Sequence, residues 1–299
     1  MNYGYIGLGN LGGHLAASLL RAGFAVTVHD RDRHLAERHL AMGGQWADSP
    51  AAVAAASYTV ITCLPSPTVS ETVLREMLPH LCPGACWIEM STLGRDDIVR
   101  LAALAAEYGV QVMESPVTGG VHLAGQGKIT VLAGGSPELF ETHRPALQAM
   151  GGRIFHIGPL GSAAIIKVIT NMLAFIHLVA DGEALMLAKR GGLDLKTAWD
   201  VIAASSGNSF VHETEGQLIL NGSYDIAFTM DLALKDLGFA LDFGREFEVP
   251  LDLAGMVQQT FRRGRAAYGG QAQSTQIVKL LEDVLGTDLR AEGFPARLE

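Results

Sequence analysis

The sequence lacks the features that mark several large classes of protein. It has 3 cysteines, Cys63, Cys82 and Cys86, which are too few and odd in number for a disulfide framework. Cys82 and Cys86 lack the histidine or cysteine partners of a zinc site, so we expect reduced thiols and no metal. The formal net charge is -9 and basic clusters are absent, which argues against nucleic-acid binding.

Membrane and export signals are also missing. The longest apolar stretch, Gly161 to Arg190, is interrupted by Lys167, Asn171 and Asp181, whereas a membrane span needs about 20 mostly apolar residues. The first residues lack the basic flank and apolar centre of a signal peptide. We therefore expect a soluble cytoplasmic protein. With 299 residues, 48% of them hydrophobic, the chain is long enough for two domains.

A glycine-rich turn follows the first predicted strand, residues 3–6. Gly7, Gly9 and Gly12 stand in the pattern Gly-x-Gly-x-x-Gly, before a helix predicted from about Gly13 to Ala22. In this context Gly7 permits a tight turn, Gly9 lets a pyrophosphate approach the backbone, and Gly12 lets helix and strand pack closely. The amides at the helix start favour phosphate. The pattern predicts a dinucleotide site; a glycine-rich turn without a ligand is the alternative.

The residue after the second predicted strand, Ala25–His29, bears on the choice of dinucleotide. Asp30 stands where a carboxylate accepts hydrogen bonds from an adenosine ribose, and it would repel the 2'-phosphate of NADP. This favours NAD, although Asp30 is also compatible with a solvated turn. Arg31 and Arg33 leave NADP possible, because a neighbouring arginine can bind a 2'-phosphate.

Strands and helices alternate as far as residue 157, which predicts an α/β fold with a doubly wound, mostly parallel sheet. Ligands bind beyond the carboxyl ends of such strands, so the loops that begin at Gly7, Asp30, Leu64, Ser91 and Ser115 should share one edge. The further predicted strands are 58–62, 86–90, 111–114, 129–133 and 153–157, and the further predicted helices are 71–81, 96–108 and 137–150.

The loop at Ser115 has a distinctive composition. The hydroxyl of Thr118 is followed by Gly119 and Gly120, whose backbone amides carry no side-chain obstruction. Such a group of donors suits a carboxylate or another oxyanion. The alternative is an ordinary turn into the next strand.

Only helices are predicted after residue 157. A boundary near Gly158 to Gly161 gives domains 1–160 and 161–299, and a long helix follows, with Ser162 as its N-cap and Arg190 near its end. Lys167 and Asn171 lie on one face of that helix. A lysine in such apolar surroundings suggests a function, since burial of an unpaired ammonium is costly. Further helices are predicted near 195–204, 210–220, 230–247, 253–268 and 275–285.

Other charged residues have simpler interpretations. A surface pair of Asp231 with Lys235 fits their spacing on a helix. Asp181, together with His177 and Glu183, has no spacing that forms a metal-ligand face, so we expect solvated or interface side chains. The arginines between 262 and 265 are expected to be a solvated helix end.

Four motifs together resemble the β-hydroxyacid dehydrogenases, the family of 3-hydroxyisobutyrate dehydrogenase and of the tartronate semialdehyde, glyoxylate and succinic semialdehyde reductases. These motifs span nearly the whole chain: residues 4–12, 115–120, 158–171 and 235–238. The resemblance implies an N-terminal Rossmann domain, a long interdomain helix, and an all-α C-terminal substrate domain that commonly forms dimers or tetramers.

The resemblance also implies roles for individual residues. Lys167 would be the catalytic residue and Asn171 its orienting partner, while Thr118, Gly119 and Gly120 would bind the substrate. The residues implied to bind NAD, or possibly NADP, are Gly7, Leu8, Gly9, Asn10, Leu11, Gly12, Asp30, Arg31, Leu64, Pro65, Thr92 and Lys235.

The reaction implied is reversible hydride transfer between the nicotinamide and a small 3-hydroxy acid or its semialdehyde. Neutral Lys167 would take the hydroxyl proton during oxidation, which should therefore be favoured at alkaline pH. Two alternatives are an imine reductase-like NADPH enzyme and a non-catalytic dinucleotide-binding oligomerisation module; Lys167 argues against both, because it is usually replaced in them. His122, Leu123 and Lys128 depart from the usual family pattern and leave the substrate open.

Overall fold

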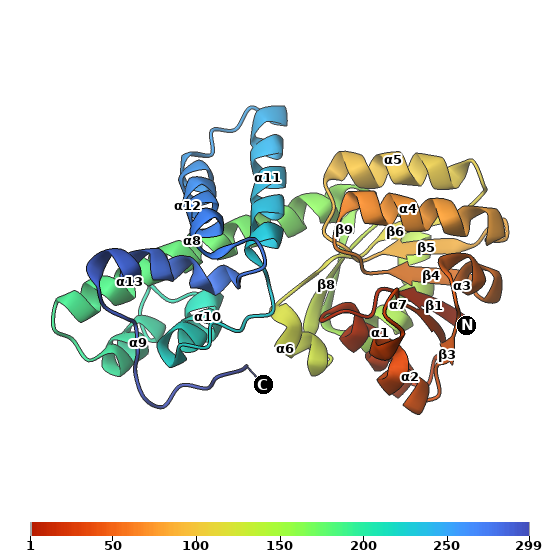
Figure 1. Ribbon diagram of the computed structural model, residues 1–299. Coiled ribbons are helices and arrows are strands. Elements are labelled where there is room, and N and C mark those ends of the chain that lie inside the picture. The colour runs from red at the N-terminus through yellow and green to blue at the C-terminus, as the bar shows by residue number, and fades with distance from the viewer. Residues whose placement is uncertain (1, 299) are drawn as a thin grey trace. The chain divides into compact units, whose positions relative to one another are not determined.

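The computed structural model describes residues 2–298, which form two compact units that divide after Lys167. The first unit is an α/β structure and the second is helical (Figure 1). One helix, α8 (Ser162–Arg190), begins in the first unit and continues into the second.

A single nine-stranded sheet forms the centre of the first unit. Its strands are β1 (Asn2–Ile6), β2 (Ala25–His29), β3 (Gln45–Trp46), β4 (Thr59–Thr62), β5 (Cys86–Glu89), β6 (Gln111–Glu114), β7 (Val117–Thr118), β8 (Ile129–Gly134) and β9 (Gly151–Gly158). Their order is β3-β2-β1-β4-β5-β6-β8-β7, with β9 also beside β8. Strand β8 runs antiparallel to β6 and β7, and the other pairs are parallel. The predicted mostly parallel sheet is confirmed.

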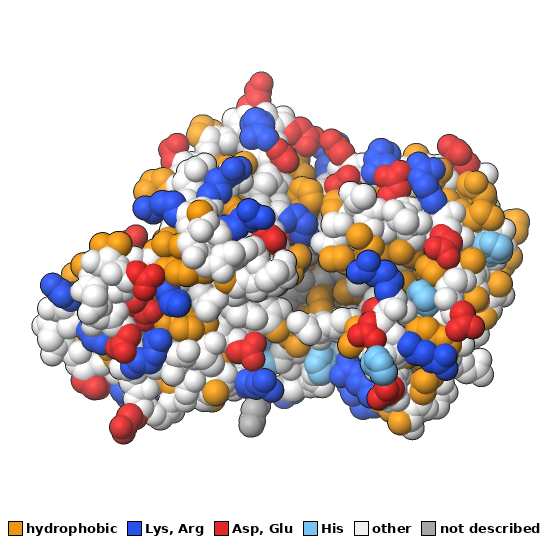
Figure 2. All heavy atoms as spheres, viewed as in Figure 1, with side chains coloured by type: hydrophobic (Ala, Val, Ile, Leu, Met, Phe, Trp, Pro, Cys, Tyr) orange, Lys and Arg blue, Asp and Glu red, His pale blue; other side chains and the backbone are white. Residues whose placement is uncertain are grey.

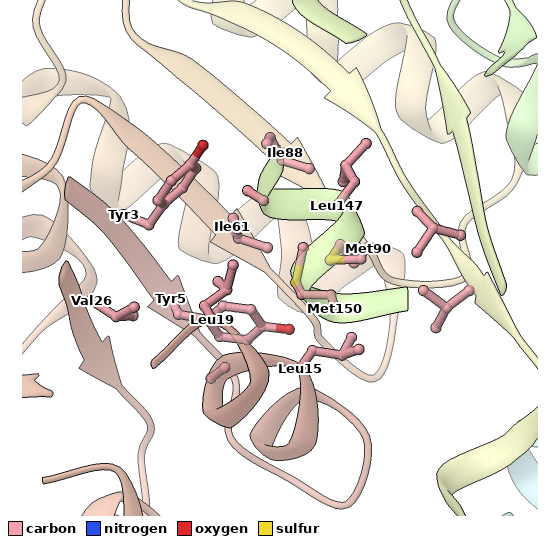
Figure 3. Packing of buried hydrophobic residues seen from close by; sticks show 14 of the residues in the cluster. Tyr3, Tyr5, Leu15, Leu19, Val26, Ile61, Ile88, Met90, Leu147 and Met150 are labelled. Atoms are coloured by element: carbon pink, nitrogen blue, oxygen red, sulfur yellow. The ribbon is translucent and has the colours of Figure 1, made fainter. Parts of the chain in front are cut away.

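Helices cover both faces of this sheet (Figure 1). They are α1 (Gly12–Arg21), α2 (Glu37–Ala41), α3 (Pro50–Ala56), α4 (Pro67–Met77), α5 (Arg95–Ala106), α6 (Gly120–Gly125) and α7 (Pro137–Met150), with short 3-10 turns η1 (Arg33–Ala36) and η2 (Leu78–His80). On one face Tyr3 and Tyr5 pack with Leu15 of α1 and Leu147 of α7 (Figure 3). On the other face Trp87 packs against α3, α4 and α5. Burial on both faces matches the continuous apolar strands of a parallel sheet.

One predicted helix is displaced in the structure. Helix α4 begins at Pro67, where a loop was expected, and ends at Met77. The hydroxyl of Ser66 accepts a hydrogen bond from the amide of Val69, and Pro67 occupies the first turn, where a missing N–H costs nothing. The prolines therefore start the helix. The short elements η1, α2, β3, α3, β7 and α6 were not predicted.

The second unit is helical, as predicted. Besides the main part of α8 it contains α9 (Leu195–Ala203), α10 (Phe210–Asn221), α11 (Met230–Glu246), α12 (Asp252–Tyr268), η3 (Ser274–Val278) and α13 (Lys279–Leu285). Within residues 168–298 the only β pairing is an isolated bridge between Thr229 and Gln273. Leu178 of α8, Leu237 of α11 and Phe261 of α12 lie in its core.

Helix α8 is apolar over most of its length, and 39% of its most apolar stretch is buried inside the protein. Of the helices in residues 2–298, α8 is the one long and apolar enough to cross a membrane by length and composition, and buried helices of soluble proteins pass the same test. The expectation that Asp181 is solvated or at an interface is wrong. Its carboxylate is only 7% exposed, and Oδ1 lies 2.6 Å from Nδ1 of His212. Interior packing of α8 explains this burial.

Candidate functional site

The carboxyl ends of five parallel strands align in one row. Ile6 at the end of β1 pairs with His29 of β2 and with Thr62 of β4, Thr62 pairs with Glu89 of β5, and Glu89 pairs with Glu114 of β6. The loops after these strands therefore leave the sheet at the same edge. In an open parallel sheet this edge is where ligands bind.

The three glycines of the first loop meet different steric constraints. Gly7 has φ +98°, and a Cβ there would lie 2.2 Å from the carbonyl oxygen of Cys63. A Cβ at Gly12 would lie 2.1 Å from the carbonyl oxygen of Gly7. A Cβ at Gly9 would meet no atom within 4 Å. Packing therefore requires Gly7 and Gly12, while the open space at Gly9 fits a pyrophosphate approaching the start of α1.

Asp30 is joined to this loop by a hydrogen bond. Its Oδ2 accepts from the amide of Leu8 at 2.7 Å, and its Oδ1 accepts from the amide of Asp32 at 3.0 Å. Asp30 is partly buried and Arg31 is exposed. In the glycine-rich loop Asn10 is exposed and Leu11 partly buried. The carboxylate thus has a fixed position beside the turn in which a dinucleotide would bind.

A buried carboxyl group supports the neighbouring loops. Glu89 is 1% exposed and accepts hydrogen bonds from the hydroxyl of Thr62 at 2.9 Å and from the amide of Ser91 at 2.7 Å. Ser91 Oγ in turn accepts from the amide of Leu64 at 2.7 Å. Burial raises the pKa of Glu89. This network fixes the backbone next to Pro65 and Thr92. The only feature of the sequence that could have indicated it is a polar residue at each strand end.

The loop after β6 contains two successive glycines with positive φ. Gly119 has φ +121° and Gly120 has φ +86°, in the region that favours glycine. Thr118 ends β7 and is partly buried, and Gly120 is exposed and begins α6. Successive amides with such a backbone can form a concave group of donors. The ring of His122 lies 3.1 Å from where a Cβ on Gly120 would stand.

Glu114 caps the start of helix α8. Its Oε1 accepts from the amides of Gly161 at 2.6 Å and Ala163 at 3.0 Å, and its Oε2 accepts from the amide of Ala164 at 2.9 Å. Burial raises the pKa of this carboxyl to about 7, and the three amide donors oppose that rise. The predicted N-cap role of Ser162 is wrong: its hydroxyl donates to the carbonyl of Pro159 at 2.6 Å. Glu114 lies too far away in the sequence to be predicted as the cap.

Lys167 and Asn171 are both buried on α8, 8% and 9% exposed, and lie one turn apart. Within the second unit, Nδ2 of Asn171 donates to Oδ2 of Asp236 at 2.6 Å, and Nζ of Lys235 lies 2.9 Å from Oδ1 of the same carboxylate. The predicted pair of Asp231 with Lys235 is wrong. Asp231 pairs with an arginine of α12, as described below.

These residues have the chemical groups that a dinucleotide-dependent reaction needs. The first unit has a glycine-rich turn with open space, a carboxylate after β2, a group of amide donors after β7, and a buried lysine at its end. Within residues 2–298 no three histidine, cysteine, aspartate or glutamate side chains come together as a metal site would require.

Two family models match the chain. Residues 2–158 match the NAD-binding domain of 6-phosphogluconate dehydrogenase, and residues 161–281 match the NAD-binding domain of NADP-dependent 3-hydroxyisobutyrate dehydrogenase.

Individual relatives cover nearly the whole chain. The 2-(hydroxymethyl)glutarate dehydrogenase of Eubacterium barkeri is 33% identical over 96% of this chain and 96% of its own. The L-threonate dehydrogenase of Cupriavidus necator is 31% identical over 95% of this chain and 97% of its own. A solved structure of Mycobacterium tuberculosis 3-hydroxyisobutyrate dehydrogenase with L-serine has a TM-score of 0.84 and 27% identity, and the match covers 94% of this chain and 98% of that one.

Proposed function

Because the chain belongs to the β-hydroxyacid dehydrogenase family, we propose that it transfers hydride reversibly between a nicotinamide dinucleotide and a small 3-hydroxy acid or its semialdehyde. As a member of this family it is an NAD(P)-dependent oxidoreductase that acts on the CH–OH group of a small hydroxy acid. The observation that carries the proposal is the burial of Lys167, only 8% exposed, in the same compact unit as the dinucleotide turn and the donors of residues 118–120.

The names of the relatives support a 3-hydroxy acid of the 3-hydroxyisobutyrate type. 2-(Hydroxymethyl)glutarate, L-threonate, L-serine and 3-hydroxyisobutyrate each carry a hydroxyl on the carbon β to a carboxylate. We assign the substrate carboxylate to Thr118, Gly119 and Gly120, whose backbone suits an oxyanion. His122 and Leu123 lie against these glycines and would shape the pocket around the rest of the substrate.

Each of the remaining residues has a task in this mechanism. The bound dinucleotide supplies the nicotinamide that accepts or donates hydride. In oxidation, Nζ of neutral Lys167 takes the hydroxyl proton, and in reduction the ammonium returns it. Asn171 orients the amine or the substrate oxygen, and its own amide is held by Asp236 at 2.6 Å. Residues 7–12, Leu64, Pro65, Thr92 and Lys235 complete the dinucleotide site.

Several finer properties belong to the same proposal. NAD is the preferred dinucleotide, because the Asp30 carboxylate suits a ribose and repels a 2'-phosphate, while exposed Arg31 permits some use of NADP. The dinucleotide domain ends near residue 160, the helical domain supports a homodimer or homotetramer, and the enzyme acts in the cytoplasm.

Replacement of the buried lysine tests the proposal. The wild-type protein is first assayed with NAD and NADP on 3-hydroxyisobutyrate, 3-hydroxypropionate, L-serine, glycerate and 4-hydroxybutyrate. On the best substrate, Lys167→Ala should lower kcat by about 10²-fold or more, since general acid–base catalysis contributes that much, while dinucleotide binding is kept. Lys189→Ala on the same helix removes a surface pair with Asp288 and should leave turnover unchanged.

Two results would contradict it. Near-normal turnover of Lys167→Ala excludes the lysine as acid and base. Absence of any change in fluorescence or melting temperature with either dinucleotide would mean that neither NAD nor NADP binds, which excludes the proposed reaction.

A further inference from the structure

A pocket in the second unit lies between helices α11 and α12, which pack against each other. It has a volume of about 400 Å³ and is lined by Leu234, Gln258, Arg262, Arg265 and Ala266. This volume is within the range of sites for small molecules, roughly 300–1,000 Å³. Figure 2 shows basic side chains gathered on the face where Figure 1 places α12.

The pocket carries an excess of positive charge. Nε of Arg265 lies 2.5 Å from Oδ1 of Asp231, a carboxylate that also accepts a hydrogen bond from Gln271 at 3.4 Å. Arg262 makes no ion pair or hydrogen bond with any residue between 2 and 298. Of the two guanidinium groups that line the pocket, one is therefore paired with a carboxylate, and the positive charge of Arg262 is left over in a chain whose net charge is -9.

Gln258 gives the pocket a buried polar wall. It is 8% exposed and lies one turn before Arg262 on α12. Its side-chain amide makes no hydrogen bond to the part of the chain that the structure describes. The amide is not among the polar atoms that are cut off from solvent without a partner, so it is accessible in the cavity and can donate to a ligand there. Leu234 and Ala266 supply an apolar surface beside it.

This pocket is distinct from the residues assigned to the reaction. None of the proposed catalytic, substrate or dinucleotide residues lines it. Leu234 and Asp236 are two residues apart on α11, so their side chains point about 160° away from each other around the helix axis. The pocket therefore opens on a different face of α11 from the carboxylate that holds Asn171.

We propose that this pocket is a second ligand site, which binds a small organic monocarboxylate. The guanidinium of Arg262 pairs with the carboxylate, because arginine presents parallel donors that match its two oxygens. The Gln258 amide donates a further hydrogen bond, and the aliphatic part of the ligand lies against Leu234 and Ala266. One uncompensated charge matches a monoanion, and the apolar wall favours a carboxylate with a short chain over a bare inorganic anion.

Binding of butyrate to the full-length protein, measured by NMR titration, tests the site. Arg262→Gln and Gln258→Leu should each raise the dissociation constant of butyrate at the pocket on the order of tenfold, since hydrogen bonds to charged groups contribute about 1.5–3 kcal/mol. Arg263→Gln and Gln259→Leu change neighbouring residues of the same types that do not line the pocket, and both should behave as wild type. Any butyrate bound at the catalytic site is common to all five proteins, so the difference reports on the pocket.

Three outcomes would overturn the proposal. If butyrate binding is weakened equally in Arg262→Gln and Arg263→Gln, butyrate is attracted to the basic surface in general and not to the pocket. No loss in either pocket variant would mean that butyrate binds only elsewhere. Inorganic phosphate that binds as tightly as butyrate, with the same loss in Arg262→Gln, would exclude a site that selects organic carboxylates.

Discussion

Asn171 of α8 and Asp236 of α11 share a buried hydrogen bond, in which Nδ2 donates to Oδ2 at 2.6 Å. Lys235 approaches the other carboxylate oxygen at 2.9 Å, and Asp236 itself is only 1% exposed. Two residues assigned to different ligands, the substrate and the dinucleotide, therefore share one carboxylate partner. Under the proposed function Asp236 would be a positioning residue, and it was not predicted from the sequence although it adjoins Lys235.

Removal of this carboxylate should destabilise the helical unit. We expect Asp236→Ala to lower the free energy of unfolding by about 3 kcal/mol, because it removes the buried carboxylate to which Asn171 donates and with which Lys235 forms an ion pair. The double mutant with Asn171→Ala should lose less than the sum of the single losses. Urea unfolding followed by circular dichroism measures both. Asp231→Ala, which breaks an exposed pair, should cost less than about 1 kcal/mol; equal costs at 231 and 236 would contradict the assignment.

Substitutions at two glycines of the first loop should have different effects, one on dinucleotide binding and the other on stability. Gly9→Ala adds a methyl group where no atom lies within 4 Å, so the melting temperature should hardly change, while the dissociation constant of NAD should rise about tenfold or more. Gly12→Ala places its Cβ 2.1 Å from the carbonyl oxygen of Gly7 and should lower the melting temperature strongly. Calorimetry on both variants checks this. Unchanged NAD binding in Gly9→Ala would argue against a pyrophosphate at this turn.

Asp30 should control the choice between dinucleotides. Asp30→Ser removes the acceptor for the ribose and the repulsion of a 2'-phosphate, and Arg31 remains exposed beside it. We expect kcat/KM with NAD to fall about tenfold and the value with NADP to rise. Asp32→Ser, at an exposed position whose carboxylate accepts from the amide of His34, is the control. A preserved NAD preference in Asp30→Ser would place the determinant elsewhere.

A pair of acidic residues in the helical unit, the buried Asp181 and the partly buried Glu215, should make stability depend on pH. Burial and the charge of Asp181 raise the pKa of Glu215 from 4.5 to about 8. Burial lowers the pKa of His212, but hydrogen bonds to Asp181 and to the carbonyl of Trp199 raise it overall above 6.5. The folded state therefore binds more protons than the unfolded state. Stability should fall as pH rises from about 4.5 to about 8 for Glu215, and above 6.5 for His212.

The measurement is the urea midpoint of unfolding between pH 5 and pH 9. In Glu215→Gln the decline should be shallower than in wild type, because one of the groups whose pKa is raised in the folded state is gone. A midpoint that rises towards pH 9 would show that these residues hold no extra proton in the folded state.

The sequence predicted the architecture because each element carries its own local signal. Gly7, Gly9 and Gly12 mark the first turn, and alternation of apolar strands with helices marks the sheet. The predicted start of α4 was wrong because, in the sequence, a helix that begins at a proline resembles a loop until its N-cap, Ser66, is recognised. The two-residue strands β3 and β7 are too short to produce a periodic pattern.

The supporting contacts of the site could not be predicted. Glu89, Glu114 and Asp236 each act on residues far away in the chain, such as Ala163, 49 positions after Glu114, or Asn171, 65 positions before Asp236. A single sequence shows only a carboxylate near a strand end or inside a helix. Which amide it meets depends on tertiary packing.

Glu114 connects the sheet of the first unit to the start of the helix that carries Lys167. The same strand end leads into the loop of Thr118 and, through three amides, holds the first turn of α8, so Lys167 follows directly from a segment tied to the sheet. Lys167 is the last residue of the first unit. The separation between the proposed proton donor, Lys167, and the loop proposed to bind the substrate carboxylate is therefore an internal dimension of the amino-terminal unit. It would keep its value in any arrangement of the helical unit.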